Sequence, residues 1–312
     1  MAGAIEALSS TGGMLVPPVM GAAAFIIPDM IGGTYLDVMK SALIPGLLFY
    51  TTVFMFIQVQ ANRLGIHKVP KSELPKLGGI LKEYIHLFVP IAVLLFLLIV
   101  MDVSTKLAGF WAVISLVAVS MLRKNTRMSS RVMVSALEGG ARTTLIVAIA
   151  CASAGLIEGV ISLTGLGLRF SELLIRIAGG NMFLLLILTM LASLVIGLPL
   201  PPVTAYLILA ILAAPALIKS GINPMAAHLF IFHFGVLGNI TPPSAPCSFA
   251  AAGIAKTDPL KTTNLAFLIS APTFIVPFLF VYSPELMMQG SILSVIARIL
   301  AAFVAISGVS VA

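Results

Sequence analysis

The chain has 312 residues, of which 60% are hydrophobic and only 9% are charged, and its formal net charge at pH 7 is +7. An ordinary soluble domain carries about a quarter charged residues, so this composition excludes one and predicts an all-α polytopic membrane protein. The positive charge lies mostly in short loops between apolar stretches, which is typical of membrane topology. No basic patch alternates with exposed aromatics, so we do not expect a nucleic-acid partner.

The first feature along the chain is the pattern Gly-x-x-x-Pro-Pro at residues 13–18, which we call the first break. Adjacent prolines remove two backbone donors and clash with the preceding turn, so a helix cannot continue through them. Residues 12–28 are too short to cross a bilayer, which needs about 20 residues. We therefore predict the tip and returning arm of a re-entrant hairpin within residues 1–40, with Asp29 and Asp37 at an interface.

Residues 41–142 are predicted to form scaffold-like spans at 41–61, 84–101 and 106–122. The two basic loops contain Arg63, His67, Lys68, Lys71, Lys76 and Lys82, and then Arg123, Lys124, Arg127, Arg131 and Arg142. The positive-inside rule places both loops in the cytoplasm and residues 101–105 outside. For residues 129–142 two alternatives stay open, namely a surface helix in the membrane interface or an extension of the next span.

Residues 143–264 are predicted to form a transport region with a second break at 197–202 and a third at 238–246. A span at 143–163 carries Glu158 near its end, and 165–180 is a connecting segment. Residues 181–196 and 203–218 flank the second break, and 225–237 and 244–255 flank the third. Two further spans, at 265–282 and 292–311, form the C-terminal region 265–312.

The three breaks share the pattern Gly-x-x-x-Pro-Pro inside apolar surroundings. In the third, Gly238 and Asn239 are the residues that best tolerate turns and left-handed backbone. Unpaired backbone groups in lipid cost several kcal/mol each, so a break at membrane depth must be buried in protein or line a cavity. Paired broken helices indicate the binding site of a secondary transporter, although each proline pair could instead end a helix at the membrane surface.

Oxygen-bearing side chains cluster at the breaks: Thr204 follows the second, and Asn239, Thr241 and Ser244 lie in the third. Hard cations such as Na⁺ prefer oxygen ligands, and a carboxylate can bind the free amides at a helix start. His228 and His233 are five positions apart, hence on different helix faces, and we interpret each as a core histidine. No nucleophile–base or metal-ligand spacing occurs, so we expect neither an enzyme nor an organic cofactor.

A wider set of motifs resembles a transporter family. Ala-Ala-His-Leu-Phe at 226–230, Thr-Pro-Pro at 241–243, Ala-Ala-Ala-Gly-Ile-Ala at 250–255 and Asp-Pro at 258–259 look like the large membrane subunit of tripartite ATP-independent periplasmic (TRAP) transporters. Residues 12–13, 17–25, 163–167 and 214–217 are similar to the fused form, which joins the small and large membrane subunits. The likeness covers essentially the whole chain.

The resemblance implies Na⁺-driven import of organic anions, usually carboxylates, by an elevator-type inverted-repeat permease of the inner membrane. Its implied partners are a periplasmic solute-binding protein and the small membrane subunit or an upstream part of the permease. By position, the resemblance implies a substrate site with Pro17, Pro18, Thr204, Thr241, Pro242, Pro243 and Ser244. It implies Na⁺ ligands at Gly13, Gly197, Gly238, Asn239 and Thr241.

The second and third breaks are about forty residues apart. A matching partner for the first break would lie upstream of Met1, so we expect the chain to be the C-terminal part of a longer permease. Two alternatives stay open. One is an ion-coupled antiporter that needs no binding protein and relies on a carboxylate such as Glu158 or Asp29. The other is a split or inactive fragment.

Overall fold

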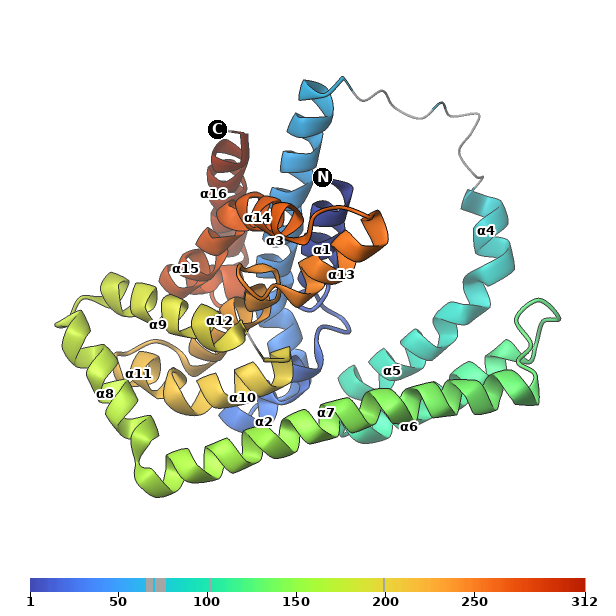
Figure 1. Cartoon of the computed structure of the whole chain (residues 1–312), viewed down its shortest axis with the longest axis horizontal. Helices are drawn as coiled ribbons and strands as arrows, with labels where there is room; N and C mark the ends of the chain where they lie inside the picture. The colour runs from blue at the N-terminus through green and yellow to red at the C-terminus, as the bar shows by residue number, and fades with distance from the viewer. Residues whose placement is uncertain (66–69, 71–76, 102, 199, 312) are drawn as a thin grey trace. The chain divides into compact units, whose positions relative to one another are not determined.

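The computed structural model describes residues 1–65, 70, 77–101, 103–198 and 200–311, and over these residues the regular structure is entirely helical (Figure 1). The chain divides into two compact units. Unit 1 comprises Met1–Gly33, Asp37–Leu64 and Ala150–Ala312, and unit 2 comprises Thr34–Leu36 and Gly65–Ile149. Of the predicted cytoplasmic basic residues, His67, Lys68, Lys71 and Lys76 lie outside the described residues.

Among the described residues, four stretches are long and apolar enough to cross a membrane: Tyr35–Arg63, Leu81–Ile99, Pro202–Lys219 and Pro259–Tyr282. A fifth is possible if Cys151–Thr164 and Leu166–Ala178, which meet at a 74° bend, form one broken span. The prediction of a polytopic all-α membrane protein is thus confirmed. The span predicted at 106–122 forms a shorter helix, α6 (Thr105–Ser120), of 16 residues, and α9 (Met182–Gly197), which leads into the second break, also has 16.

Unit 2 contains a helical hairpin whose two ends are joined by hydrogen bonds. Its elements are α4 (Leu77–Tyr84), η2 (Ile85–Phe88), α5 (Val89–Ile99), α6 and the first part of α7 (Ser130–Thr164). After α6, the Arg123 guanidinium donates to the carbonyls of Lys82 at 2.8 Å and Glu83 at 2.7 Å. The residues before α5 and after α6 therefore lie together, as a membrane hairpin with both basic loops on one side requires.

The long helix α7 decides between the two alternatives for residues 129–142. It runs from Ser130 to Thr164 without interruption, so this segment extends the following span. Glu138 and Arg142 pair at 2.8 Å on its exposed surface. A single exposed pair at this spacing adds only about 0.3–0.5 kcal/mol, so the continuity of α7 does not rest on it.

The core of unit 1 is built around α12 (Pro224–Leu237). Asn223 begins the helix by accepting the Met225 amide at 2.9 Å, and Pro224 occupies the first helical position, where no amide donor is needed. Every residue from Met225 to Leu237 is buried. Helices α9, α10 (Pro202–Leu212), α11 (Ala214–Lys219) and α15 (Ile275–Tyr282) pack around it. A helix apolar on all sides is stable only in such an enclosed position.

The connecting segment predicted at 165–180 forms a helix, α8 (Leu166–Ala178). It begins after Gly165, whose φ of 66° is left-handed, and it packs against α9, α10 and α11. The Ser171 hydroxyl donates to the Leu212 carbonyl at 2.8 Å, at the end of α10. This bond occupies one of the carbonyls that a helix end leaves without a partner.

The remaining helices of unit 1 are α1 (Ala2–Gly12), η1 (Ala22–Phe25), α2 (Ile27–Ile31), α3 (Tyr35–Arg63), η3 (Gly238–Ile240), α13 (Pro246–Ala255), α14 (Pro259–Ser270), η4 (Ala271–Phe274), η5 (Pro284–Met287) and α16 (Ile292–Val311). Helix α1 packs against α13 and α14, and α13 packs against α14. This arrangement brings the chain before the first break next to the chain after the third.

Candidate functional site: the three helix breaks

Each Pro-Pro pattern interrupts a helix, as predicted. Helix α1 ends at Gly12, and its return consists only of η1 and the short α2. Helix α9 ends at Gly197 and α10 begins at Pro202. Helix α12 ends at Leu237, and α13 begins at Pro246 after η3. The peptide bonds Pro17–Pro18 and Pro242–Pro243 are cis.

The third break is the element that meets the others. Its η3 turn contacts α1, which leads into the first break, and α9, which leads into the second. On the return side, η1 of the first break packs against α10, which follows the second. The fold therefore gathers three segments that lie far apart in the sequence.

Two glycines make the contact between the second and third breaks. A Cβ added to Gly238 would lie 2.6 Å from the Gly197 carbonyl carbon, and one added to Gly197 would lie 2.8 Å from the Gly235 carbonyl oxygen. The backbones thus touch where no side chain fits. In addition, the Ser244 hydroxyl donates to the Leu198 carbonyl and joins the two breaks directly.

Gly238 and Asn239 lie in a turn, within η3. Gly238 is right-handed, with φ of −51°, and Asn239 is absent from the residues with positive φ. The positive φ of this break falls on Ala245, at 26°. The glycine at 238 is therefore required by the close approach of Gly197, and not by its own dihedral angles.

Two of the predicted oxygen-bearing side chains of the third break, Asn239 and Thr241, are buried and hydrogen-bonded. The Asn239 amide donates to the Val236 carbonyl at 3.2 Å, and the Thr241 hydroxyl donates to the Leu237 carbonyl at 2.8 Å. Both bonds tie these side chains to carbonyls at the end of α12. Each side chain keeps acceptor capacity on its oxygen, since a hydroxyl or amide oxygen has two lone pairs.

Thr204 behaves differently from most hydroxyls of the chain. Its side chain is 2% exposed, yet its Oγ1 has no hydrogen-bond partner. Some other buried threonines donate to the carbonyl four residues before, as Thr52 does to Leu48 at 3.0 Å. An unsatisfied buried polar group costs about 1–3 kcal/mol, so such an atom indicates a ligand, ion or water that the protein accommodates.

Further unpartnered hydroxyls flank the breaks, and the sequence prediction missed them. They belong to Thr189 and Ser193 on α9, Ser248 on α13 and Thr263 on α14, and all four side chains are buried. Thr189, Ser193 and Gly197 follow one another at intervals of four, so they lie on one face of α9. The spacing of four was the sequence signal that could have predicted the two hydroxyls of α9, because α9 packs against α12.

The structure places the remaining predicted residues less centrally. Gly13 and Pro18 are exposed and Pro17 is half-buried at the end of α1, while Pro242 is half-buried and Pro243 exposed in the third break. Of the two carboxylates considered for an antiporter, Asp29 is exposed on α2 and Glu158 is half-buried on α7. Among the described residues, no group of three or more His, Cys, Asp and Glu side chains is arranged to hold a metal ion.

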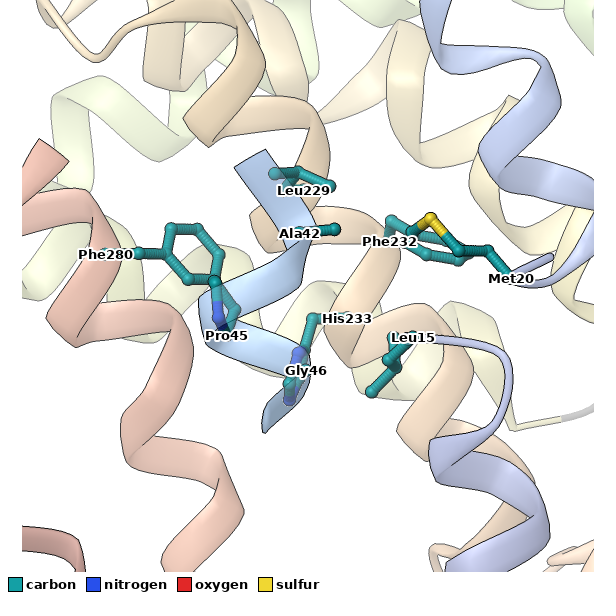
Figure 2. A pocket seen from close by; sticks show the side chains of 9 residues that line it. All are labelled: Leu15, Met20, Ala42, Pro45, Gly46, Leu229, Phe232, His233 and Phe280. Carbon is teal, nitrogen blue, oxygen red and sulfur yellow. The ribbon is translucent and has the colours of Figure 1, made fainter. Parts of the chain in front are cut away.

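The two histidines of α12 have separate surroundings. His228 Nδ1 lies 2.8 Å from the Tyr206 hydroxyl, a buried bond that ties α12 to α10. The His233 ring hydrogen-bonds to the backbone of Thr273 and lines a small cavity with Leu15 and Met20, which belong to the first break and its return (Figure 2). His233 therefore places the middle of α12 next to the first break.

Comparisons with known proteins agree with these features. A family model described as "Tripartite ATP-independent periplasmic transporter, DctM component" matches residues 1–295. The chain is also similar to the 2,3-diketo-L-gulonate TRAP transporter large permease protein YiaN of Escherichia coli (strain K12), with 24% identity over 251 residues. That alignment covers 80% of this chain and 58% of the relative, so the chain spans somewhat more than half of the curated relative's length.

Proposed function

The chain belongs to the family of DctM components of TRAP transporters, which are multi-pass permeases of the inner membrane and not enzymes, and from this premise we propose that it imports organic anions by Na⁺-coupled secondary transport. The observation that carries the proposal is the meeting of the breaks, where the buried and unpartnered Thr204 hydroxyl stands beside two interrupted helices. Interrupted helices at membrane depth supply both carbonyls for a cation and free amides for an anion.

For the Na⁺ ion, we propose ligands from the two glycine-lined breaks. Gly197 and Gly238 bring unwound backbone together, and Thr241 and Asn239 add buried oxygens. Of the predicted oxygens, the Thr204 hydroxyl has no hydrogen-bond partner, whereas the Thr241 hydroxyl already donates to Leu237. Oxygen-only surroundings suit a hard cation. The first break, including Gly13, is proposed to approach this region from α1.

For the substrate, we propose an organic anion with a carboxylate. The starts of α10 and α13 have no side-chain cap, so their first amides are available to an anion. Thr204, Ser244 and the Pro-Pro pairs at 17–18 and 242–243 lie at or beside these starts and are the proposed contacts. The similar large permease protein YiaN is named for 2,3-diketo-L-gulonate, which is itself an organic anion.

The proposed partners are a periplasmic solute-binding protein that delivers the anion and a small membrane subunit, which in the fused form is part of the same polypeptide. We further propose that residues 143–264 carry the transport region, that residues 41–142 act as scaffold, and that the helices of the breaks form an inverted repeat that moves as an elevator. The contact of η3 with both α1 and α9 supports this assignment.

The proposal is tested by uptake of a labelled organic-anion mixture into proteoliposomes that contain the chain, the small subunit and the cognate binding protein. We expect uptake to require an inward Na⁺ gradient and to require the binding protein. Uptake driven by a proton gradient without the binding protein would instead favour the antiporter alternative.

A pair of isosteric variants sharpens the same experiment. We expect Thr204→Val to lower Na⁺-driven uptake at least about tenfold, the effect of losing about 1.4 kcal/mol of ion binding. Its stability should stay the same or rise, because an unsatisfied hydroxyl is removed. Thr52→Val is the control, since Thr52 is equally buried but its hydroxyl is bonded to Leu48. Equal uptake by both variants would contradict an ion or substrate role for Thr204.

A further inference from the structure

A small cavity lies beside the first break. Its volume is about 10 Å³, close to the 10–15 Å³ that one water molecule needs. It is lined by Leu15, Met20, Ala42, Pro45, Gly46, Leu229, Phe232, His233 and Phe280. Figure 2 shows His233 reaching from α12 toward Gly46 of α3, with Leu15 nearby. The cavity is therefore bounded by the first break and by three helices, α3, α12 and α15.

His233 presents an unused polar atom to this cavity. The side chain is 4% exposed, and its Nε2 has no hydrogen-bond partner. The ring cannot turn freely, because its other nitrogen is bonded to the backbone of Thr273 and its faces and edges meet Phe49 and Phe234. Buried polar atoms in native proteins are nearly always paired with protein or ordered water. Nε2 is thus held in position for a small partner.

Helix α3 forms one wall of the cavity. Ala42, Pro45 and Gly46 all line it, so this turn of α3 faces it. Pro45 lies inside α3 and has no amide hydrogen, so it offers no donor to the cavity.

The first break supplies a second polar atom, the Leu15 carbonyl oxygen. A Cβ added to Gly46 would lie 3.2 Å from the Leu15 carbonyl oxygen and 2.9 Å from Val16 Cγ2. The absence of a side chain at Gly46 therefore allows the backbone of the first break to approach α3 at the edge of the cavity. Leu15 also lines the cavity itself, so its peptide group lies close to the space next to His233.

We propose that this cavity is a binding site for one water molecule, which donates one hydrogen bond to His233 Nε2 and one to the Leu15 carbonyl oxygen. A buried water requires two to four polar partners, and this pair provides two. The water joins the first break and α12, which no direct side-chain bond in this cavity joins among the described residues. A Na⁺ ion fits this position less well, because an imidazole nitrogen and apolar walls replace the oxygen ligands that a hard cation prefers. The proposal does not rest on the proposed transport function.

The test is solid-state NMR of the full chain in lipid bilayers with ¹⁵N-labelled histidine. The chain has four histidines, so the ring signals are few, and His233→Gln assigns those of His233. We expect magnetisation transfer from water to the His233 ring, of equal intensity in NaCl and in KCl. Absence of that transfer in the unmodified chain would overturn the proposal, and transfer that appears in only one of the two salts would show that a cation occupies the site.

A matched pair of alanine variants locates the water. Ala42→Val adds two methyl groups to the cavity wall and is expected to abolish the transfer to His233. Ala210→Val makes the same change at a buried alanine of α10 that does not line the cavity, and is expected to leave the transfer unchanged. Transfer that persists in Ala42→Val would mean that the water contacts His233 from another side and would contradict the assignment. The signals of the other histidines report whether each variant keeps its fold.

Discussion

The first and third breaks carry the same Gly-x-x-x-Pro-Pro pattern, yet they differ in their surroundings. Gly238, Asn239 and Ile240 of the third break are buried on all sides. Gly13 and Pro18 of the first are exposed, and the return that follows consists of two very short helices. The shared sequence pattern therefore determines where the helix ends, whereas the helices packed around each break determine how deeply it is buried.

The two breaks also differ in which donors reach their carbonyl oxygens. In the third, the side chains of Asn239 and Thr241 reach back to Val236 and Leu237 within the same segment. In the first, Tyr50 of α3 donates to the Ser9 carbonyl at 2.8 Å from another helix, and the loop closes by a bond from the Gly21 amide to the Met14 carbonyl. These carbonyls of the third break thus receive donors from their own segment, whereas the first break also receives one from α3.

The largest expected effect is a difference in stability between alanine variants of the two glycines that open these breaks. In Gly238→Ala the new methyl group would lie 2.6 Å from the Gly197 backbone, which cannot move aside without separating α9 from α12. We expect a loss of about 3–5 kcal/mol of stability, near the top of the range for single substitutions. Gly13→Ala is the matched control, because Gly13 is exposed and right-handed, with φ of −59°. Thermal unfolding in detergent should show a large loss for Gly238→Ala and little change for Gly13→Ala; similar losses would contradict the comparison.

A smaller effect is expected at the contact of the first break with α3. A Cβ on Gly12 would lie 2.3 Å from Phe49 Cε1, and Phe49 is fully buried. Overpacking of this kind costs about 1–3 kcal/mol, so Gly12→Ala should lower the melting temperature. The partner change Phe49→Leu frees the space that the methyl group needs. In a double-mutant cycle the two changes should therefore be less harmful together than their sum, and strict additivity would show that Phe49 is not the obstacle.

The location of the breaks could be predicted from the sequence because the loss of a proline donor acts locally. The close approach of Gly197 and Gly238 could not, since it depends on two residues brought together only by packing of α9 on α12. The same limit applies to hydroxyls: Thr52 and Thr204 have the same chemistry, but only the fold decides that one bonds to its own helix and the other does not. Residues 165–180 were predicted only as a connecting segment, although Glu172 and Arg176 have the spacing of an exposed helical pair, and the structure forms α8 there.

An intermediate effect is expected for the polar link between the arms of the second and third breaks. Tyr206→Phe removes the hydroxyl bonded to His228 Nδ1 in a fully buried position. A buried partner left alone costs about 1–3 kcal/mol, and the phenylalanine preserves the shape of the ring. Chemical denaturation should show this loss of stability. Restoration by His228→Leu in the same chain would confirm that the unpaired imidazole is its cause, and a loss that the second change does not relieve would point to repacking instead.

The smallest effect is expected where the first break is linked to α3. Tyr50→Phe removes the bond to the Ser9 carbonyl, but that oxygen also accepts the Gly13 amide at 3.1 Å and so keeps one partner. The net value of a hydrogen bond is about 0.5–1.5 kcal/mol, and the remaining donor should hold the loss to the lower end. Hydrogen exchange should then rise at the last turn of α1 and at Met14 and Leu15, while the amides of α12 stay protected. Faster exchange in α12 would mean that the bond from Tyr50 to Ser9 supports the core of unit 1, and not the first break alone.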